Sequence, residues 1–518
     1  MTGSAIGRMS LLSVRAKSLR STLSGQDLKS RLIRGTFWAS IGALVSRGFA
    51  LVSSVIVGRL LGNEGYGEMG MIYSTMGMFG VFAGFGLGSA ATKYIAEYRL
   101  TDSARTGRIF TLVSITSLVT GCVMFLVAFL LSPWLASYFL NRPDISTLLQ
   151  AGALLLFIST VAGVQQGVLA GFESFRKIAR LSLCQGVTSP VITVPCVMLY
   201  GVHGAITAYT INTGLTLILC VVAVRSELAR NRIPVTEPLM GCWSERAILI
   251  RFALPAMFSS SLILPVTWIT NTILVNSSGG YGELGLFNAA NQWRQVIIFL
   301  PALLSSAILP ILAQTHGQED KSDFRRVVAL NLRMIWIIAL PATVLIITLG
   351  KPLTALFGHQ FTGAAPLVAV LMTSCFLTVV NGPVGAALVG AGKMWMGTLM
   401  NLGWATALVL FSSLLIPTYG GLGLALGYLF AYLLHTVWQM IYVEIKLAPR
   451  AILALWRLVL LSGVLLTAGM WISTKGYGSY ISSLTLMAFS AMPLAGLLIQ
   501  KIRNQGSNVL QPESVNYL

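Results

Sequence analysis

Long apolar stretches, separated by short breaks rich in charged residues, Gly or Pro, run through most of the chain. A helix needs about 20 mainly apolar residues to cross a hydrocarbon core of about 30 Å. Fourteen stretches of this kind are present, at 35–57, 69–95, 109–132, 147–170, 181–200, 204–224, 248–273, 284–312, 332–350, 364–389, 397–417, 421–443, 456–473 and 481–500. The pattern predicts an all-α polytopic membrane protein with fourteen transmembrane helices.

Composition favours a membrane protein and excludes several other classes. Of the 518 residues, 55% are hydrophobic and 10% are charged, whereas soluble domains carry roughly 25% Asp, Glu, Lys and Arg. A water-soluble enzyme, a disordered tail protein and a disulfide scaffold are therefore excluded. The six cysteines form no CxxC pair, and five of them lie in apolar stretches, which is typical of small buried side chains.

Sequence motifs for nucleotide hydrolysis and metal catalysis are not found. The chain contains neither GxxxxGK[ST] nor HExxH, and its four histidines are scattered, so covalent or metal catalysis has no set of residues to carry it. We expect a protein that is not an enzyme and that holds no metal and no cofactor. A net charge of +19 would point to nucleic acid in a soluble protein, but here the positions of the basic residues explain it, and no nucleic-acid partner is expected.

The basic residues predict the orientation of the helices. With the N-terminus inside, the tails and alternate loops on the cytoplasmic side hold 29 of the 35 Lys and Arg residues, whereas the outer loops hold four and the helices two. Positively charged loops stay in the cytoplasm. We therefore expect a multi-pass protein of the inner (plasma) membrane with both termini cytoplasmic.

Residues 1–34 form a basic cytoplasmic tail in this topology. The segment lacks the apolar core of a secretory signal, so we expect the first helix to direct membrane insertion. Leucines are spaced among the basic residues, which suits a helix lying on anionic lipid. A disordered positive tail that fixes the orientation is an equally good interpretation.

An internal repeat divides the chain. Gly65-Tyr66-Gly67-Glu68-Met69-Gly70 recurs 215 residues later as Gly280-Tyr281-Gly282-Glu283-Leu284-Gly285, and a Tyr-Gly-x-x-Gly turn at 200–204 recurs at 419–423. Two six-helix lobes in the same orientation are predicted, and parallel repeats of this kind build transporters around a cavity at the membrane midplane. The predicted domains are the tail 1–34, an N-lobe 35–224, a cytoplasmic linker 225–247, a C-lobe 248–443, and the last two helices with the C-terminal tail at 444–518.

The repeated hexapeptides match the letters GxGxxG but not the context of a dinucleotide site. That site requires a preceding strand, whereas each copy here joins two membrane helices. We interpret the glycines as a tight turn with positive φ and Glu68 and Glu283 as residues of a first helical turn, favoured there by the helix dipole. A gating or proton-linked role for the two carboxylates is the alternative.

Two arginines inside predicted helices are the candidate binding residues. Arg47 lies about twelve residues, or ~18 Å, into the first helix, and Arg294 lies about ten residues, or ~15 Å, into the eighth. An arginine at this depth costs at least ~2.5–3.5 kcal/mol, so it should face a cavity or a partner, and no Asp or Glu occupies a helix centre. Its planar fork suits phosphate or carboxylate. Bonds to backbone carbonyls at a helix break are the alternative.

Three amides accompany the second arginine. Asn288, Asn291 and Gln292 precede Arg294 at spacings that bring side chains to one helix face. Amides that line a hydrated cavity would suit a sugar-bearing or otherwise polar substrate. We therefore include all three in the predicted substrate site with Arg47 and Arg294.

The residues quoted so far resemble a known family. Three segments are similar to the Wzx-type polysaccharide-biosynthesis flippases of the multidrug/oligosaccharidyl-lipid/polysaccharide (MOP) exporter superfamily. They are the helix from Gly35-Thr36-Phe37-Trp38 to Arg47, the segment Gly58-Arg59-Leu60-Leu61-Gly62-Asn63-Glu64-Gly65-Tyr66-Gly67, and the segment Gly171-Phe172-Glu173-Ser174-Phe175. The resemblance covers 35–443 well and the last two helices loosely.

The resemblance implies a function. The protein would move an undecaprenyl-pyrophosphate-linked oligosaccharide from the cytoplasmic to the outer leaflet by alternating access, with Arg47 and, less securely, Arg294 binding the anionic carrier head group. It would work as a monomer in the bilayer, with a polysaccharide polymerase as a candidate partner. Two alternatives within the superfamily are a flippase for the peptidoglycan precursor lipid II and a cation-coupled multidrug exporter, and a membrane scaffold without transport is a third.

Overall fold

The computed structural model describes residues 28–234, 239–299 except 255 and 258–261, and 322–475, together with 301, 308, 312, 315, 486 and 488–493. Helices are the regular secondary structure of this described part. Most of the predicted tail 1–34, the far half of the eighth predicted helix and most of the fourteenth lie outside the described residues. The count of fourteen transmembrane helices therefore stays a prediction, whereas the helical membrane fold is confirmed.

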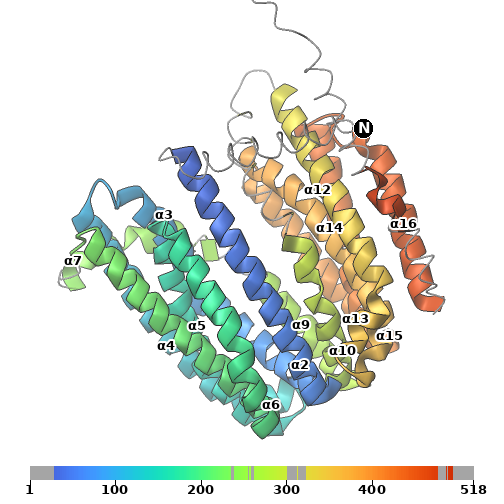
Figure 1. Ribbon diagram of the computed structural model, residues 1–518, viewed down its shortest axis with the longest axis horizontal. Coiled ribbons are helices and arrows are strands. Elements are labelled where there is room, and N and C mark those ends of the chain that lie inside the picture. Colours follow the sequence, from blue (N-terminus) through green and yellow to red (C-terminus); the bar gives the residue numbers. More distant parts are fainter. Residues whose placement is uncertain are drawn as a thin grey trace, which may run out of the picture. The chain divides into compact units, whose positions relative to one another are not determined.

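The chain divides into two compact units. The first contains residues 1–53, 76–135 and 144–261, and the second contains residues 54–75, 136–143 and 262–518. Residues 54–75 and 136–143, which the sequence places in the N-lobe, pack with the second unit. The main helices are α2 (Leu28–Gly84), α3 (Leu87–Tyr98), α4 (Ser103–Trp134), α5 (Ser146–Gly171), α6 (Phe175–Arg230), α7 (Leu239–Trp243), α9 (Ile263–Val275), α10 (Gly280–Gln292), α12 (Ser322–Thr348), α13 (Gly350–Ala355), α14 (Ala365–Gly390), α15 (Met394–Tyr442) and α16 (Trp456–Lys475) (Figure 1).

Three of these helices are hairpins of two arms. At 1.5 Å per residue, the 56 residues of α6 would extend for about 84 Å, far more than one crossing of a bilayer. A glycine with positive φ breaks each one: Gly62 in α2, Gly201 in α6 and Gly420 in α15. The backbone angles at Gly201 and Gly420 are identical, with φ 55° and ψ −131°. The predicted turns at these two repeated positions are therefore confirmed.

Contacts across the breaks show that the arms are antiparallel. In α6, Thr188 Oγ1 donates to Asn212 Oδ1 at 2.6 Å, and these residues are equally far from residue 200. In α15, the rings of Trp404 and Tyr432 lie 5.2 Å apart, on opposite sides of Gly420. Pairs that are symmetric about a turn are typical of a chain that folds back on itself. The hairpins α6 and α15 thus each cover two of the predicted helices.

The first unit is built around α5, which packs against α3, α4 and α6. Small residues allow the closest approach: a Cβ added at Gly167 would lie 2.4 Å from the carbonyl oxygen of Gly88. Thr92 Oγ1 donates to the carbonyl oxygen of Gly167 at 3.0 Å across this contact. Close backbone approach through small residues is the usual way in which helices associate in a membrane.

The second predicted helix is interrupted in the structure. The stretch 69–95 divides into the end of α2 and α3, because Phe85 and Gly86 both have positive φ, 46° and 66°. Such backbone angles end a right-handed helix. The break brings Gly86 so close to Ala253 that an added Cβ would lie 2.3 Å from its carbonyl oxygen.

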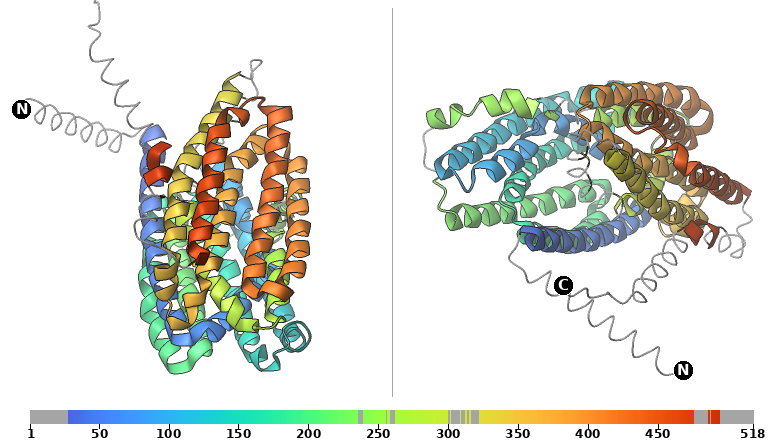
Figure 2. Two further views of the ribbon diagram at one scale, coloured as in Figure 1. Left: turned by 90° about the vertical axis from the view of Figure 1, so that its right-hand side faces the viewer. Right: turned by 90° about the horizontal axis from the view of Figure 1, so that it is seen from above.

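In the second unit, α14 lies between α12 and α15, and α16 packs against α12 and α14 (Figure 2). Most of α14 is buried, including the run from Leu367 to Phe376, which explains its nearly continuous apolar sequence.

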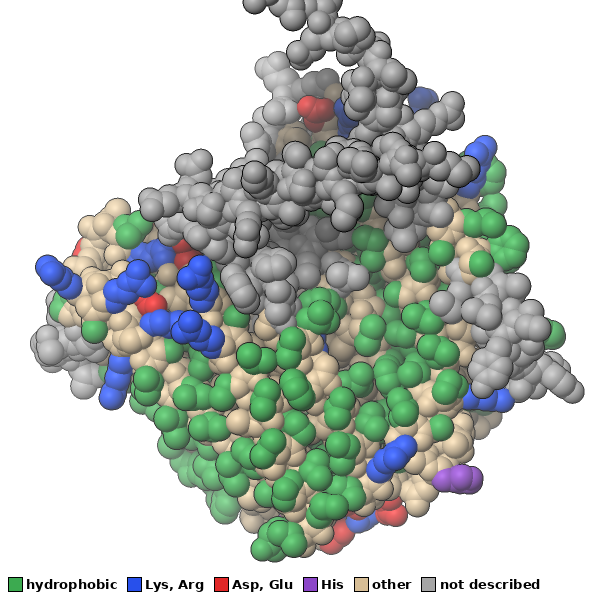
Figure 3. All heavy atoms as spheres, viewed as in Figure 1, with side chains coloured by type: hydrophobic (Ala, Val, Ile, Leu, Met, Phe, Trp, Pro, Cys, Tyr) green, Lys and Arg blue, Asp and Glu red, His purple; other side chains and the backbone are tan. Residues whose placement is uncertain are grey.

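Elsewhere hydrophobic side chains cover the sides of the helices, and Lys and Arg gather near α3, α4 and α7 at one end of the first unit (Figure 3). This distribution suits helices with their sides in lipid and one end at a basic surface.

The two repeated hexapeptides pack directly on each other within the second unit. A Cβ added at Gly67 would lie 1.8 Å from the carbonyl oxygen of Tyr281, and one added at Gly285 would lie 1.8 Å from the carbonyl oxygen of Asn63. In the first copy the positive φ belongs to Gly62, before the motif, and in the second to Gly279 and Gly280. The predicted turn role is thus wrong for Gly67 and Gly285, which are needed for close helix contact.

Candidate functional site

Arg294 stands directly after α10, at a break in the helix. The N–H of Trp293 donates back to the carbonyl oxygen of Ala290 at 3.3 Å, and a turn at 293 separates α10 from the helical residues 294–299. Arg294 is half-buried at this point of the chain. The sequence alternative was a bond to backbone carbonyls at a helix break, and the hydrogen bond that the Arg294 side chain makes goes instead to the side chain of Asn291.

The Arg294 guanidinium has a polar partner and an aromatic partner. Its Nη1 donates to Asn291 Oδ1 at 3.1 Å, and its carbon lies 5.9 Å from the ring centroid of Tyr428. The Nε atom is buried without a hydrogen-bond partner. None of the ion pairs in the described part of the chain involves Arg294.

This arrangement leaves binding capacity at the arginine. A guanidinium has five N–H donors, and a buried donor without a partner costs about 1–3 kcal/mol. An anion that accepts from several of these donors would remove that cost and form charge-assisted bonds. The geometry around Arg294 thus suits a phosphate or carboxylate.

The three predicted amides contact two different parts of the second unit. Asn291 accepts from Arg294, whereas Gln292 Nε2 donates to the hydroxyl of Tyr66 at 3.3 Å. The side chain of Asn288 packs against Gly70, and its Nδ2 is buried without a hydrogen-bond partner. The structure therefore brings Asn291 together with Arg294 and places Asn288 and Gln292 against the first repeated hexapeptide.

Arg47 belongs to the first unit, where it is an exposed residue of α2 within the apolar span Leu44–Gly84. Because Arg294 belongs to the second unit, each arginine is described within its own unit. A joint role for the two remains a prediction.

Sequence reasoning missed the aromatic residues next to Arg294. Tyr428 is 4% exposed, its hydroxyl lies 3.2 Å from Thr267 Oγ1, and its ring lies 6.3 Å from that of Tyr432. The signal was present, because two tyrosines at i and i+4 share one helix face. Its connection to Arg294 depends on how α15 packs against α10, which no local pattern contains.

A second missed group surrounds the repeated hexapeptides. Arg142 Nη2 lies 2.7 Å from Glu68 Oε1, its Nη1 lies 3.3 Å from Glu64 Oε1, and its guanidinium carbon is 5.2 Å from the ring of Tyr281. The repeat-related Glu283 instead accepts from the N–H of Gly421 at 2.8 Å. Both glutamates therefore stabilise contacts between segments that are distant in the sequence.

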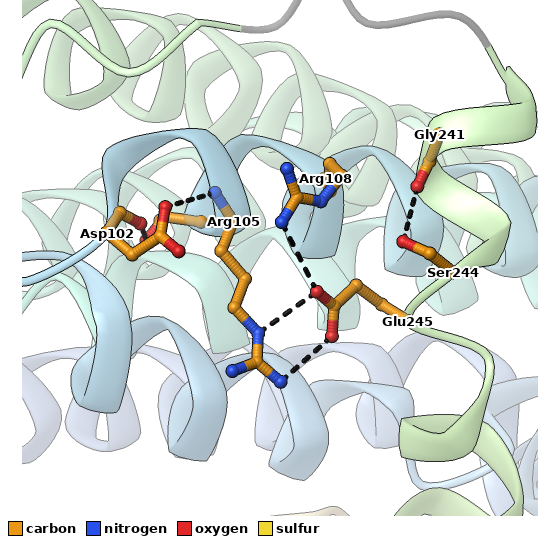
Figure 4. A network of polar contacts seen from close by, with 7 residues as sticks. Asp102, Arg105, Arg108, Gly241, Ser244 and Glu245 are labelled. Atoms are coloured by element: carbon orange, nitrogen blue, oxygen red, sulfur yellow. Dashed lines mark hydrogen bonds and ion pairs between the residues drawn. The ribbon is translucent and has the colours of Figure 1, made fainter.

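The predicted linker is attached to the first unit by a forked ion pair (Figure 4). Arg105 Nε and Nη2 contact the two oxygens of Glu245 at 3.0 and 3.1 Å, and Arg108 Nη2 approaches Glu245 Oε1 at 3.6 Å. Asp102 accepts from the N–H of Arg105 at 2.8 Å and caps α4. A bidentate arginine–carboxylate pair fixes orientation as well as adding energy, so the segment after α7 is held against the start of α4.

Two cavities lie outside the Arg294 environment. One, of about 440 Å³, is in the first unit between α4, α5 and α6 and has Gln165 and Arg225 in its lining. The other, of about 540 Å³, is in the second unit between residues 58–64 and 357–361. The described residues contain no group of three or more His, Cys, Asp and Glu that could hold a metal ion.

The fold defines the chain as a polytopic helical membrane protein. Its structure aligns with lipid II flippase MurJ in an inward closed conformation at a TM-score of 0.68 and 11% identity, over 90% of this chain and 99% of that one. It also aligns with an inward-facing multidrug resistance MATE family transporter at a TM-score of 0.62 and 17% identity, over 76% of this chain and 94% of that one.

Sequence comparison identifies the family. A family model described as polysaccharide biosynthesis protein matches residues 32–316, and the MatE model matches residues 255–413. The chain is 24% identical over 413 residues to the lipid III flippase of Escherichia coli (strain K12), covering 78% of this chain and 96% of that protein. The chain belongs to the polysaccharide biosynthesis protein family of the MOP superfamily.

Proposed function

We propose that the protein is a flippase that translocates undecaprenyl-pyrophosphate-linked oligosaccharide repeat units from the cytoplasmic to the outer leaflet by alternating access. The observation that carries the proposal is Arg294, a half-buried arginine with a buried, unpartnered Nε. A pyrophosphate is an anion that accepts several hydrogen bonds at once, as this group requires. Membership of the polysaccharide biosynthesis family supports a lipid-linked sugar as the cargo.

Each residue of the site has a proposed task. Arg294 binds the pyrophosphate, while Asn291 holds the guanidinium through Nη1 and Tyr428 supports its face. Arg47 is a second proposed contact for the head group. Asn288 and Gln292 keep their predicted substrate role as a proposal for the state in which their contacts with the first hexapeptide are released.

The distribution of carboxylates disfavours a cation-coupled drug exporter. The acidic residues of the described chain lie near helix ends, as Glu64, Glu68 and Glu283 do beside the glycine turns. An exporter coupled to Na⁺ or H⁺ typically requires a carboxylate inside the bundle. Lipid II and lipid III share the anionic head of the proposed cargo, so the assay includes lipid-linked sugars of each kind.

Translocation of defined substrates in proteoliposomes tests the proposal. The substrates are an undecaprenyl-pyrophosphate-linked repeat unit, lipid II, a lipid III-type glycolipid and a cationic drug. We expect Arg294→Ala to weaken pyrophosphate binding by about 10- to 150-fold, the equivalent of losing a charge-assisted bond of ~1.5–3 kcal/mol. Arg294→Lys retains the charge but lacks the planar fork, so its affinity for pyrophosphate should lie between that of the wild type and that of Arg294→Ala.

The matched control is Arg246→Ala, which removes an exposed arginine of the linker and should transport like the wild type. Transport of the drug but of no lipid-linked sugar would contradict the proposal. So would an Arg294→Ala protein that transports the repeat unit at the wild-type rate. A preference for lipid II would identify the peptidoglycan precursor as the transported substrate instead.

A further inference from the structure

A buried histidine lies between two side-chain amides in the second unit. His435 of α15 is 7% exposed, and its neighbours Asn381 of α14 and Gln439 of α15 are 8% and 4% exposed. His435 Nδ1 is 3.3 Å from Asn381 Nδ2, and its Nε2 is 3.1 Å from Gln439 Nε2. Both ring nitrogens are thus within hydrogen-bond distance of an amide, one from each helix.

Hydrogen-bond accounting shows that the site can hold two protonation states. A neutral imidazole has one donor and one acceptor, whereas an imidazolium has two donors. Asn381 Oδ1 and Gln439 Oε1 are both buried without a hydrogen-bond partner. Turning both amides by half a turn brings these oxygens to the ring nitrogens, where they accept from an imidazolium. Turning one of them satisfies the neutral ring.

In the described part of the chain, no carboxylate contacts His435. The elements that pack against α15 are α14, α9, α10 and the turn Val443–Leu447. Glu283 is bound to the N–H of Gly421, far along α15, and Glu444 accepts from the N–H groups of Arg450 and Ile452. The other ionisable groups of these elements and of α15 are Cys375, Tyr281, Lys446, Tyr419, Tyr428, Tyr432 and Tyr442.

The two amides therefore decide whether the charge is tolerated. A buried charge without partners is strongly disfavoured, so the imidazolium requires both amide oxygens as acceptors. Ionisable residues inside membrane helices commonly mark proton pathways. His435 has the geometry of such a site, whereas the sequence shows it as an isolated residue.

The histidine and the arginine are connected through one face of α15. Tyr428, Tyr432, His435 and Gln439 follow at spacings of four, three and four residues, which places them on the same side of the helix. The Arg294 guanidinium carbon lies 5.9 Å from the Tyr428 ring, and seven residues of helix place His435 about 10 Å beyond Tyr428 along the axis. For unit charges separated by roughly 12 Å at an effective dielectric constant near 20, the interaction changes binding on the order of tenfold.

We propose that His435, held by Asn381 and Gln439, is a proton-binding site whose occupancy is linked to the binding of an anion at Arg294. The proton adds a positive charge to the face that carries the arginine, so proton and anion each favour binding of the other. The identity of the anion as a lipid pyrophosphate rests on the proposed function, whereas proton binding at His435 does not. The site would make transport sensitive to a pH gradient.

Deuterium exchange at the histidine C2 position, followed by mass spectrometry on the full chain in nanodiscs, measures protonation peptide by peptide. We expect the His435 peptide to show a sigmoidal pH dependence. Gln439→Met removes one acceptor oxygen and should move its midpoint to lower pH. Undecaprenyl pyrophosphate should move the midpoint by about one pH unit to higher pH, as a tenfold linkage requires, whereas undecaprenol should not, and Arg294→Ala should abolish this shift.

Transport under an imposed pH gradient is the second readout. His435→Gln should lose the response to the gradient, whereas His203→Gln, an exposed histidine of α6, should respond like the wild type. A His435 peptide without a titration midpoint, or a midpoint unmoved by Gln439→Met, would overturn the proton site. If the site titrates but no lipid-linked sugar is transported, the proposed function fails and the proton site stands.

Discussion

The contact between the two repeated hexapeptides predicts the effect of a single methyl group. In Gly67→Ala the new Cβ would lie 1.8 Å from the carbonyl oxygen of Tyr281, 2.8 Å from its carbonyl carbon and 2.9 Å from the nitrogen of Gly285. Ordinary van der Waals contact begins near 3.4 Å. The helices must therefore separate by about 1.6 Å, since the atoms in the way belong to the backbone.

The size of the effect follows from the packing. Forcing extra methyl groups into a filled contact costs about 1–3 kcal/mol, which changes the equilibrium between packed and separated helices by about 5- to 150-fold. The separation also exposes Tyr66, which is 1% exposed and bonded to Ser54 and Gln292. The contact should open far more often in the variant.

Hydrogen–deuterium exchange of the backbone amides measures this opening. Peptides that cover residues 60–75 and 278–292 should exchange about 5- to 150-fold faster in Gly67→Ala, because exchange reports the free energy of local opening. Gly285→Ala should have the same effect, since its Cβ would lie 1.8 Å from the carbonyl oxygen of Asn63. Gly84→Ala is the matched control, because nothing lies within 4 Å of a Cβ at that position of α2. Equal exchange in Gly67→Ala and Gly84→Ala would refute the argument.

Two further predictions concern the glycine turns and the linker. Gly201→Ala should destabilise the protein by about 1–3 kcal/mol, seen as a lower apparent melting temperature, because φ 55° strains any residue with a Cβ although no atom lies nearby. Gly214→Ala, in the same helix and equally free of neighbours, should leave the melting temperature unchanged. Equal melting temperatures of the two variants would contradict the turn geometry. A double-mutant cycle of Arg105→Gln and Glu245→Gln should give a coupling energy of about 1 kcal/mol in thermal unfolding. The bidentate geometry strengthens the pair, whereas the 34% exposure of its arginine weakens it. Additive effects of the two substitutions would show that this ion pair does not hold the linker.

The candidate site could be predicted in part. Arg294 is recognisable as a basic residue inside an apolar stretch, and its bond to Asn291 follows from the i, i+3 spacing of a helix. Asn288 and Gln292, one helical turn apart on α10, contact the first hexapeptide instead. Helical periodicity predicts which residues share a face, but which neighbour that face meets is decided by the packing of the helices.

The sequence by itself determines the helices, their apolar lengths, the asymmetry of basic residues and the internal repeat, because each of these depends on the local transfer of side chains and backbone into lipid. Only the tertiary structure decides that Gly67 and Gly285 are contact residues, that Arg142 pairs with Glu68, and that Tyr428 lies beside Arg294. These contacts join segments far apart in the chain, and small residues in membrane helices can face any neighbour. Which neighbour each one meets depends on the packing of whole helices, and no local pattern contains it.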